Sequence, residues 1–367
     1  MKILFFASAK SIHTKKWCRW FTEQGHEVAV LTFHNDAIEN TKVFPIKTKI
    51  NTDGGDLAKL NYLTHRMEIR NTIRKIQPDI INVHYATSYG AAAAASGLRN
   101  YVLSVWGSDI YDFPRKSPVH RQLLEFSLRK AKYLFSTSRA MAKETEKYTK
   151  KEIIITPFGV DTALFSPDKR IRHDGRFVIG TVKSLYPKYG IDKILLAASE
   201  ILRRVPALPL EVRIAGSGPL EAELKELSRR LKLEAHVTWL GYISQEAASL
   251  EWANMDCAVI PSELESESFG VSAVEAEASG IPVVISDVPG LQEATEPGVT
   301  SLVVDRRNVG KIADAVLDLY YDREKRESMG RAGREFALQR YNLDTCFQIP
   351  EHYFQIWAQE NNGKYLL

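Results

Sequence analysis

Five glutamates cluster between residues 263 and 277, in the stretch "ELESESFGVSAVEAEASG". An ionised carboxylate accepts hydrogen bonds from hydroxyl groups and stabilises a nearby positive charge, so an acid in this stretch could serve a reacting site. A run of acids near a helix start can equally well do no more than favour the helix dipole. The position of each acid relative to the predicted helix and strand decides which of them could do chemistry.

A helix predicted to begin near Gly270 separates these acids by their position on its surface. Val271, Val274 and Ala278 follow one another at the spacing of a buried helical stripe. Glu275 lies next to that stripe, on an apolar flank where an unpaired carboxylate is costly. The side chain of Glu275 is therefore expected to have a partner.

The other four acids differ in their surroundings. Glu267 sits in the loop just before the helix, above the end of a predicted strand, where a bound ligand would pass. Glu277 is turned about 200° from the apolar stripe and is predicted to face solvent. Glu263 and Glu265 are expected to point to water. For Glu267 and Glu275, spacing and burial alone do not decide between chemistry and a helix dipole effect.

Strands and helices alternate along the chain, and this alternation predicts the fold class. Apolar runs rich in Val, Ile and Phe are separated by segments of helical period, which is typical of parallel sheets covered on both faces. The runs form two sets, "KILFFAS", "HEVAVLT", "DIINVHY", "YVLSVWG", "YLFSTS" and "EIIITPFG", then "FVIGTV", "EVRIAG", "HVTWLGY", "CAVIPS", "PVVIS" and "SLVV". We therefore expect two doubly wound α/β domains, with a linker at residues 165–176.

The loops after the strands of the second set have the composition of an anion site. In doubly wound sheets, ligands bind beyond the carboxyl ends of the strands. Two of these loops run into predicted helix starts, at residues 218–219 and 269–271, and the free N–H groups of helix starts hold phosphate. Lys183 and Lys188 follow the first strand of this set and could bring two positive charges to the same edge. Such a site would match a diphosphate without a metal ion.

Length and composition restrict the kind of protein. A chain of 367 residues suits two domains of ordinary size, and 44% hydrophobic with 26% charged residues is typical of a folded globular chain. The formal net charge of +4 gives little support to a nucleic acid partner. Cys18, Cys257 and Cys346 lie far apart, which argues against a disulfide framework or a zinc site and favours a reducing cytoplasm.

The most apolar stretches predict neither a leader nor a membrane span. The N-terminal "MKILFFASAK" has only a very short apolar run, so we interpret it as a first strand rather than a signal peptide. The stretch "YGAAAAASGL" is too short to cross a bilayer.

The stretch "PSELESESFGVSAVEAEASGIPVV" resembles the E-x7-E region of the family-4 retaining glycosyltransferases of GT-B fold, with Glu267 and Glu275 as the two acids. The stretches "EQGHEVAVLT", "PFGVDTALF", "AGSGPLEAELKEL", "VTWLGYIS" and "DVPGLQE" are similar to other blocks of that family and follow its order. The resemblance covers nearly the whole chain and implies two Rossmann-like domains with a cleft between them. Residues 1–165 would form the acceptor side, completed by a C-terminal helix at 343–367, and residues 166–342 the nucleotide-sugar donor side.

The resemblance assigns a role to each acid of the pair. It implies that Glu267 is catalytic and contacts the hydroxyls of the donor sugar, while Glu275 contacts the ribose of the nucleotide. The backbone amides of Phe269, Gly270 and Val271 would hold the donor diphosphate. These roles agree with electrostatics, because phosphate would repel a carboxylate whereas sugar hydroxyls and a developing positive charge suit it.

The lysine loop departs from the pattern of that family. Its members commonly have Arg-Leu and, three residues later, Lys-Gly for the diphosphate, whereas this chain has "KSLYPKYG". Ser184 holds the Arg position and Tyr189 the Lys position, and Lys183 and Lys188 each lie one residue early. Assigning both lysines to the diphosphate supposes that the loop turns to compensate, and the alternative is a plain surface charge.

The first domain departs from the family pattern as well. The glycine pair usual after the first strand is replaced by "ASAKSIH", where Lys10 or Ser11 could contribute to the site. Trp106 stands where many members have a His, and an indole cannot act as a base. Asp109 is a candidate catalytic group and equally a candidate helix cap.

His84, Tyr242 and Ile243 are assigned by their place at the end of a predicted strand or just after it. His84 is expected to face the cleft on the acceptor side, as are Lys10, Ser11 and Trp106, although a histidine satisfied by neighbouring backbone is favoured over a catalytic one. The nucleobase of the donor is expected to contact the backbone near Tyr242 and Ile243.

The segment "HTKKWCRWFTEQG" predicts a helix with one aromatic and one basic face. Packing on the sheet with a solvated basic face explains this pattern. The alternative is contact with an anionic membrane surface, which would suit the family-4 enzymes that take lipid-linked acceptors at the cytoplasmic face of the membrane.

The resemblance therefore implies a retaining, metal-independent hexosyltransferase. It would move a hexose or hexosamine from a UDP or GDP sugar to a glycan or lipid-linked acceptor in cell-envelope biosynthesis, in the cytoplasm or at the inner face of the membrane. No D-x-D motif occurs in the sequence, so no metal or other cofactor is expected. Two alternatives stay open, a non-catalytic nucleotide-sugar-binding scaffold subunit and a nucleotide-sugar epimerase of GT-B fold.

Overall fold

The chain folds as two compact units. The computed structural model describes residues 1–47, 60–171, 175–361 and 365. Unit 1 comprises Met1–Pro157 and Phe347–Leu367, and unit 2 comprises Phe158–Cys346. The chain thus leaves unit 1 at Pro157, ahead of the segment expected to be the linker, and its last helix belongs to unit 1 from Phe347 onward.

Unit 1 is built on a seven-stranded parallel sheet with the order β3-β2-β1-β4-β5-β6-β7. Its strands are β1 (Lys2–Phe6), β2 (Glu27–Thr32), β3 (Lys42–Pro45), β4 (Ile80–His84), β5 (Val102–Val105), β6 (Tyr133–Ser136) and β7 (Ile153–Ile155). All except β3 lie on the apolar runs expected to form strands. The short β3, "KVFP", has a charged first residue and ends in proline, so its apolar signal is weak.

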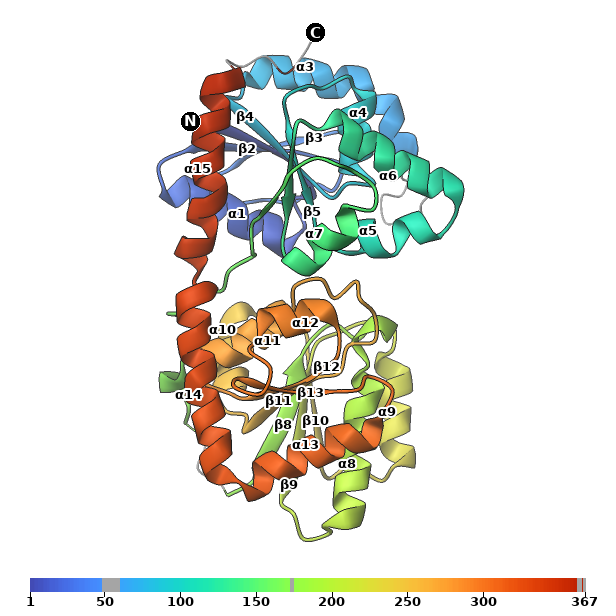
Figure 1. Cartoon of the computed structure of the whole chain (residues 1–367), viewed down its shortest axis with the longest axis vertical. Coiled ribbons are helices and arrows are strands. Elements are labelled where there is room, and N and C mark those ends of the chain that lie inside the picture. Colours follow the sequence, from blue (N-terminus) through green and yellow to red (C-terminus); the bar gives the residue numbers. More distant parts are fainter. Residues whose placement is uncertain (48–59, 172–174, 362–364, 366–367) are drawn as a thin grey trace. The chain divides into compact units, whose positions relative to one another are not determined.

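Helices cover both faces of the sheet of unit 1. They are α1 (Ile12–Glu23), α3 (Arg66–Ile76), α4 (Tyr89–Ala95), α5 (Ser108–Tyr111), α6 (Pro118–Lys130), α7 (Arg139–Thr145) and α15 (Leu343–Asn361). Figure 1 shows α1 and α15 on one face of this sheet and α4 and α6 on the other. The alternation of side chains along β1 matches this layering, because the ring of Phe5 contacts Trp17 of α1 whereas the ring of Phe6 contacts Tyr89 of α4.

The aromatic face of α1 packs into unit 1, as the packing interpretation of this helix expects. Trp17, Trp20 and Phe21 are buried, and Trp17 lies 5.1 Å from Phe347 of α15 between ring centroids. Arg19, on the basic face, is exposed. Contact of this basic face with a membrane stays a prediction. Within the described ranges, no helix combines the length and the apolar character needed to span a bilayer.

Unit 2 is built on a six-stranded parallel sheet with the order β10-β9-β8-β11-β12-β13. Its strands are β8 (Phe177–Val182), β9 (Leu210–Ala215), β10 (Val237–Gly241), β11 (Cys257–Ile260), β12 (Val283–Ser286) and β13 (Ser301–Val304). Each lies on one of the apolar runs of the second set. The strand order places the carboxyl ends of β8 and β11 side by side, and these are the strands that precede the lysine loop and the acidic loop.

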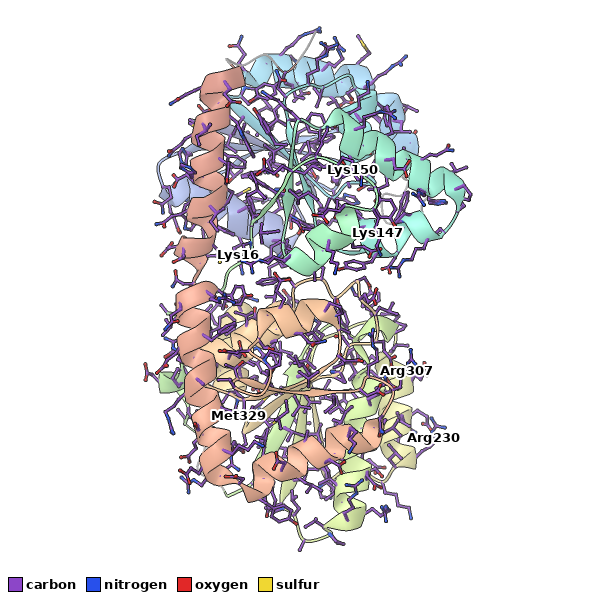
Figure 2. All side chains as sticks on the ribbon, viewed as in Figure 1. Lys16, Lys147, Lys150, Arg230, Arg307 and Met329 are labelled. Carbon is purple, nitrogen blue, oxygen red and sulfur yellow. The ribbon has the colours of Figure 1, made fainter. Side chains whose placement is uncertain are left out.

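Helices also cover both faces of the second sheet. They are α8 (Ile191–Arg204), α9 (Glu221–Arg230), α10 (Gln245–Ala253), α11 (Val271–Ala278), α12 (Pro289–Ala294), α13 (Val309–Tyr321) and α14 (Arg323–Arg340). Met329 of α14 packs into the core of this unit, whereas Figure 2 shows Arg230 at the end of α9 and Arg307 after β13 extending outward. The fold class expected from the sequence, two doubly wound α/β domains, is confirmed.

Candidate active site

The acidic stretch forms a loop and a helix at the carboxyl edge of the unit 2 sheet. Helix α11 begins at Val271, as predicted, and its N-cap Gly270 has a left-handed conformation with φ of 81°. A Cβ atom at Gly270 would lie 2.7 Å from the Leu291 side chain of α12, so both the conformation and the packing require glycine. In the first turn of α11, the N–H of Ala273 donates to the carbonyl oxygen of Gly270 at 2.9 Å. The N–H groups of Val271 and Ser272 come before this first bond of the helix, and N–H groups in that position are available to an anion.

Glu267 forms an ion pair with Lys183, and both side chains are largely buried. Lys183 Nζ lies 2.9 Å from Glu267 Oε2, and the two side chains are 11% and 8% exposed. Burial disfavours the ammonium of Lys183, but the charge of Glu267, with Tyr189 and Glu275 nearby, outweighs burial and raises the pKa of Lys183 above its ordinary value. Lys183 is therefore a permanent cation beside the acid expected to be catalytic.

Lys188 lies in the same loop, on the turn Pro187–Tyr189 that follows β8. Its ammonium lies 4.8 Å from the centroid of the Tyr189 ring, and the ammonium of Lys183 lies 4.5 Å from the same centroid. The loop therefore brings both lysines to one side chain although each stands one residue early in the sequence. The assignment of both lysines to the diphosphate stays a prediction.

Two glycines after β9 let a second loop pack closely on the lysine loop. A Cβ atom at Gly216 would lie 1.9 Å from the carbonyl oxygen of Lys183, and one at Gly218 would lie 2.5 Å from that of Leu185. The helix expected to start at residues 218–219 is α9, which begins at Glu221. The "GSGP" loop, which follows the neighbouring strand β9, thus packs directly on the lysine loop.

Glu275 has the partner that its buried position requires. Its side chain is 6% exposed, and its Oε2 accepts a hydrogen bond of 3.4 Å from Nε1 of Trp252 on α10. Glu275 also contributes to the field that keeps Lys183 protonated. The E-x7-E acids therefore lie in one unit, close to one lysine, at the start and on the inner flank of α11.

The prediction that Glu277 faces solvent is wrong. Its side chain is fully buried, its Oε1 accepts a hydrogen bond from the Thr300 hydroxyl, and burial raises its pKa well above the ordinary value. Gly333 of α14 brings that helix against this face, with a Cβ position only 3.2 Å from the Glu277 side chain. Small and apolar residues all round α11 indicate a helix buried on every side, and this signal outweighs the stripe that we used to place Glu277.

Glu263 and Glu265, both expected to point to water, are half-buried, and Glu263 has a charged partner. Its carboxylate lies 2.5 Å from Nζ of Lys193 on α8. Arg306, after β13, donates to the carbonyl oxygen of Glu263 at 3.2 Å and to Oδ1 of Asp287, after β12, at 2.9 Å. Sequence reasoning missed this network, which ties together the loops after three neighbouring strands. The basic residues directly after β13, in "DRR", are the signal that could have indicated it.

Tyr242 and Ile243 follow β10, the edge strand of the unit 2 sheet. The Tyr242 side chain is 80% exposed and Ile243 is half-buried. Both lie at the same edge of the sheet as the lysine loop. In strand order, β9 separates β10 from β8. The structure leaves their expected contact with the nucleobase as a prediction.

Asp109 ties two loops of unit 1 together. Its fully buried carboxylate accepts hydrogen bonds from the backbone N–H groups of Ala86, Trp106 and Gly107, at 2.8, 3.1 and 2.8 Å. Burial raises its pKa, and these backbone donors oppose the rise. The geometry therefore shows Asp109 positioning the loops after β4 and β5, and a catalytic role for it stays a prediction.

His84 is buried among rings rather than satisfied by backbone. It is 1% exposed and packs against Phe5, Trp17 and Trp106, whose ring centroid lies 4.5 Å from that of His84. Among the residues that the structure describes, neither ring nitrogen has a hydrogen-bond partner. Burial, with His13 nearby, lowers the pKa of His84 to about 3, so the ring is neutral. The expectation that backbone groups satisfy it is wrong.

The remaining acceptor-side candidates lie around the start of α1. Ser11 is the N-cap of this helix, where its hydroxyl accepts a hydrogen bond from the N–H of Thr14, and Lys10 is exposed. Trp106 is half-buried against His84 and His13. Lys10, Ser11, His84 and Trp106 all belong to unit 1, and no contact with a substrate tests their expected role.

Two family models match the chain one after the other. The model of the glycosyl transferases group 1 matches residues 165–336, and the glycosyl transferase 4-like model matches residues 2–138. The first contains the lysine loop and the E-x7-E acids, and the second contains Asp109 and His84.

Curated relatives match about half of the chain. It is 33% identical over 202 residues to the GDP-mannose-dependent alpha-(1-6)-phosphatidylinositol monomannoside mannosyltransferase of Mycobacterium tuberculosis, with 52% of each chain covered. It is 34% identical over 191 residues to the D-inositol 3-phosphate glycosyltransferase of Nocardia farcinica, with 48% of this chain and 42% of that relative covered. The chain thus spans about half the length of the curated relatives it matches.

Solved structures match over almost the whole chain. Sucrose-phosphate synthase from Thermosynechococcus elongatus is 20% identical with a TM-score of 0.83, and 98% of this chain and 100% of that chain are covered. The Anabaena protein Alr3699/HepE, in complex with UDP and glucose, is 19% identical with a TM-score of 0.78, and 97% and 99% are covered. At these identities the likeness shows the fold, which is GT-B.

Proposed function

This chain belongs to the family-4 group 1 glycosyl transferases, and from that premise we propose that it is a retaining hexosyltransferase. It moves a hexose or hexosamine from a UDP or GDP sugar to a glycan or lipid-linked acceptor in cell-envelope biosynthesis. The observation that carries the proposal is the buried ion pair of Lys183 and Glu267 beside the glycine-started helix α11. At this edge of the unit 2 sheet, a cation, an acid and the N–H groups of a helix start lie together.

The positive part of this site holds the donor diphosphate. The amides of Phe269, Gly270 and Val271 lie at the start of α11, and the ammonium groups of Lys183 and Lys188 come from the loop after the neighbouring strand. When the bond between the sugar C1 and the diphosphate oxygen breaks, its electron pair goes to the diphosphate. The lysines and the helix start stabilise this added charge.

The acidic part of the site faces the sugar and the ribose. Glu267 accepts hydrogen bonds from the sugar hydroxyls and stabilises the positive charge that develops at C1, and Glu275 accepts from the ribose. The acceptor hydroxyl oxygen bonds to C1 on the face that the diphosphate leaves, and its proton passes to the departing phosphate. The anomeric configuration is therefore retained.

Lysines replace a divalent cation in this proposal. The side chains described here contain no cluster of three or more His, Cys, Asp or Glu that could hold a metal ion. We propose that no metal or other cofactor takes part, and EDTA should then leave turnover unchanged. Loss of turnover in EDTA that Mg²⁺ or Mn²⁺ restores would contradict this part of the proposal.

The names of two relatives support the proposed acceptor class, and no contact in the structure does. Two of the relatives are named for acceptors that contain inositol. One of these two acceptors is a phosphatidylinositol mannoside. The basic face of α1 would suit an anionic membrane surface presenting such a lipid, so we propose a peripheral position on the inner face of the membrane.

The experiment is a donor panel. UDP-, GDP- and ADP-sugars are compared for thermal stabilisation of the chain and for slow hydrolysis of the donor. We expect stabilisation and hydrolysis by a UDP or GDP sugar. Stabilisation by none of them would contradict the proposal, and binding without hydrolysis or transfer to any acceptor would favour a scaffold subunit.

A further inference from the structure

The ring of Tyr189 connects the two lysines of the proposed donor site. The ammonium of Lys183 lies over this ring at 4.5 Å from its centroid, and that of Lys188 at 4.8 Å. A cation at such a distance is attracted by the negative face of an aromatic ring, and the attraction is stronger when the cation is desolvated. Lys183 is largely buried, so the stronger attraction applies to it.

Packing and backbone hydrogen bonds fix the position of this ring. Tyr189 is half-buried against the core of unit 2, and its N–H donates to the carbonyl oxygen of Tyr186 at 3.0 Å. The next residue, Gly190, has a φ of 62°, and a Cβ atom there would lie 2.3 Å from the carbonyl oxygen of Pro261. The N–H of Glu263 donates to the carbonyl oxygen of Lys188 at 2.8 Å. The loop after β11 thus holds the loop that carries the ring.

An aromatic ring suits this place better than a charged side chain. Two ammonium groups repel each other, and a carboxylate that held both would also repel the diphosphate. The ring attracts cations without carrying net charge. Lys183 already pairs with the Glu267 carboxylate at 2.9 Å, and the ring gives its ammonium a second, uncharged partner.

We propose that Tyr189 is a positioning residue whose ring holds Lys183 and Lys188 ready for two adjacent phosphates. This inference rests on the proposed function and deepens it. It names the side chain that lets two lysines, each one residue early in the sequence, bind the donor diphosphate together. Tyr189 selects a nucleoside diphosphate over the monophosphate, because one phosphate can engage only one of the two lysines fully.

The test is calorimetric titration of the whole chain with UDP and GDP, then with the matching monophosphate and nucleoside. Tyr189→Phe keeps the ring and should bind the diphosphate within about twofold of the parent. Tyr189→Leu removes it and should weaken diphosphate binding roughly 5- to 30-fold, the monophosphate less and the nucleoside not at all. In turnover, KM for the donor should rise more than kcat falls.

The control is Tyr186→Leu, which removes a half-exposed ring from the same loop. It should bind all ligands as the parent does. Tyr189→Met replaces Tyr189→Leu if the latter does not fold, because an unbranched apolar side chain keeps the contact with the core. Unchanged diphosphate binding in the folded variant overturns the proposal, as does an equal loss for diphosphate and nucleoside.

Failure of the proposed function would look different. In that case the parent itself would bind neither UDP nor GDP, and the inference would fall with it. A parent that binds UDP or GDP, together with a Tyr189 variant that binds it equally well, would overturn the positioning role alone.

Discussion

The two units share one plan but differ at the carboxyl edges of their sheets. In unit 2, this edge carries a buried ion pair, a second lysine and a glycine-started helix. In unit 1, His84 and Trp106 at this edge are aromatic and uncharged, since burial lowers the pKa of His84 to about 3 and Trp106 packs on it. The carboxylate of Asp109 is surrounded by three backbone N–H donors.

This difference fits the two tasks that we propose for the units, donor binding and acceptor binding. Parallel strands with helices on both faces only bring the loops to one edge, and the side chains in those loops decide what binds there. Paired charges suit an anionic donor that gains negative charge as its bond breaks. Neutral aromatic side chains suit the hydroxyl groups of a glycan or lipid-linked acceptor, which is the acceptor class that we propose.

Glu267→Gln should have the largest effect, because it removes the acid that we propose to face the sugar. Turnover should fall roughly 10²- to 10³-fold while the nucleotide still binds. Glu265→Gln, a change of a half-buried acid in the same loop, is the matched control and should turn over like the parent. Equal turnover in Glu267→Gln and the parent would remove the role assigned to Glu267.

A lysine in each unit tests the contrast between the edges. Lys183→Met keeps the apolar stem and removes the charge, so affinity for the nucleoside diphosphate should fall roughly 10- to 100-fold. Lys10→Met in unit 1 should leave that affinity within about twofold. Calorimetric titration of both variants measures this affinity. A larger loss of affinity in Lys10→Met than in Lys183→Met would contradict the proposed difference between the two edges.

The pH dependence of stability should have opposite signs in the two units. Glu277 is buried with a raised pKa, so its contribution is full below about pH 4.5 and is lost as pH rises through its folded pKa. His84 has a lowered pKa, so its contribution is full above about pH 6.5 and is lost as pH falls toward about 3. Each slope is about 1 kcal/mol per pH unit.

Urea unfolding of Glu277→Gln and His84→Phe across this pH range measures the two slopes. Relative to the parent, Glu277→Gln should gain stability as pH rises, and His84→Phe should gain stability as pH falls below 6.5. A pH-independent difference from the parent in either variant would show that the group does not titrate as its burial implies.

The strands could be predicted from the sequence, whereas the pairing of charges could not. Buried parallel strands are continuous apolar runs, so "FVIGTV" and "CAVIPS" indicate β8 and β11 directly. The ion pair of Lys183 and Glu267 depends on β8 and β11 being neighbours, which is a property of strand order. Predicting the network of Lys193, Glu263 and Arg306 also requires knowledge of the strand order.

The error at Glu277 has a different origin. The apolar stripe of Val274 and Ala278 gives the inner face of α11 correctly, but it does not say that a second helix covers the outer face. Gly333 of α14 makes that contact from a segment far along the chain. A carboxyl group can stay in such a place because the Thr300 hydroxyl donates a hydrogen bond to it, and because burial raises its pKa and so favours the uncharged form.

Amide hydrogen exchange with and without the nucleoside diphosphate tests the central claim most directly, which is that unit 2 holds the donor through α11 and the lysine loop. With binding verified in the same sample, we predict slower exchange in peptides that cover residues 183–190 and 265–275. Slower exchange confined to residues 8–14 of unit 1, with none in these two segments, would contradict the account.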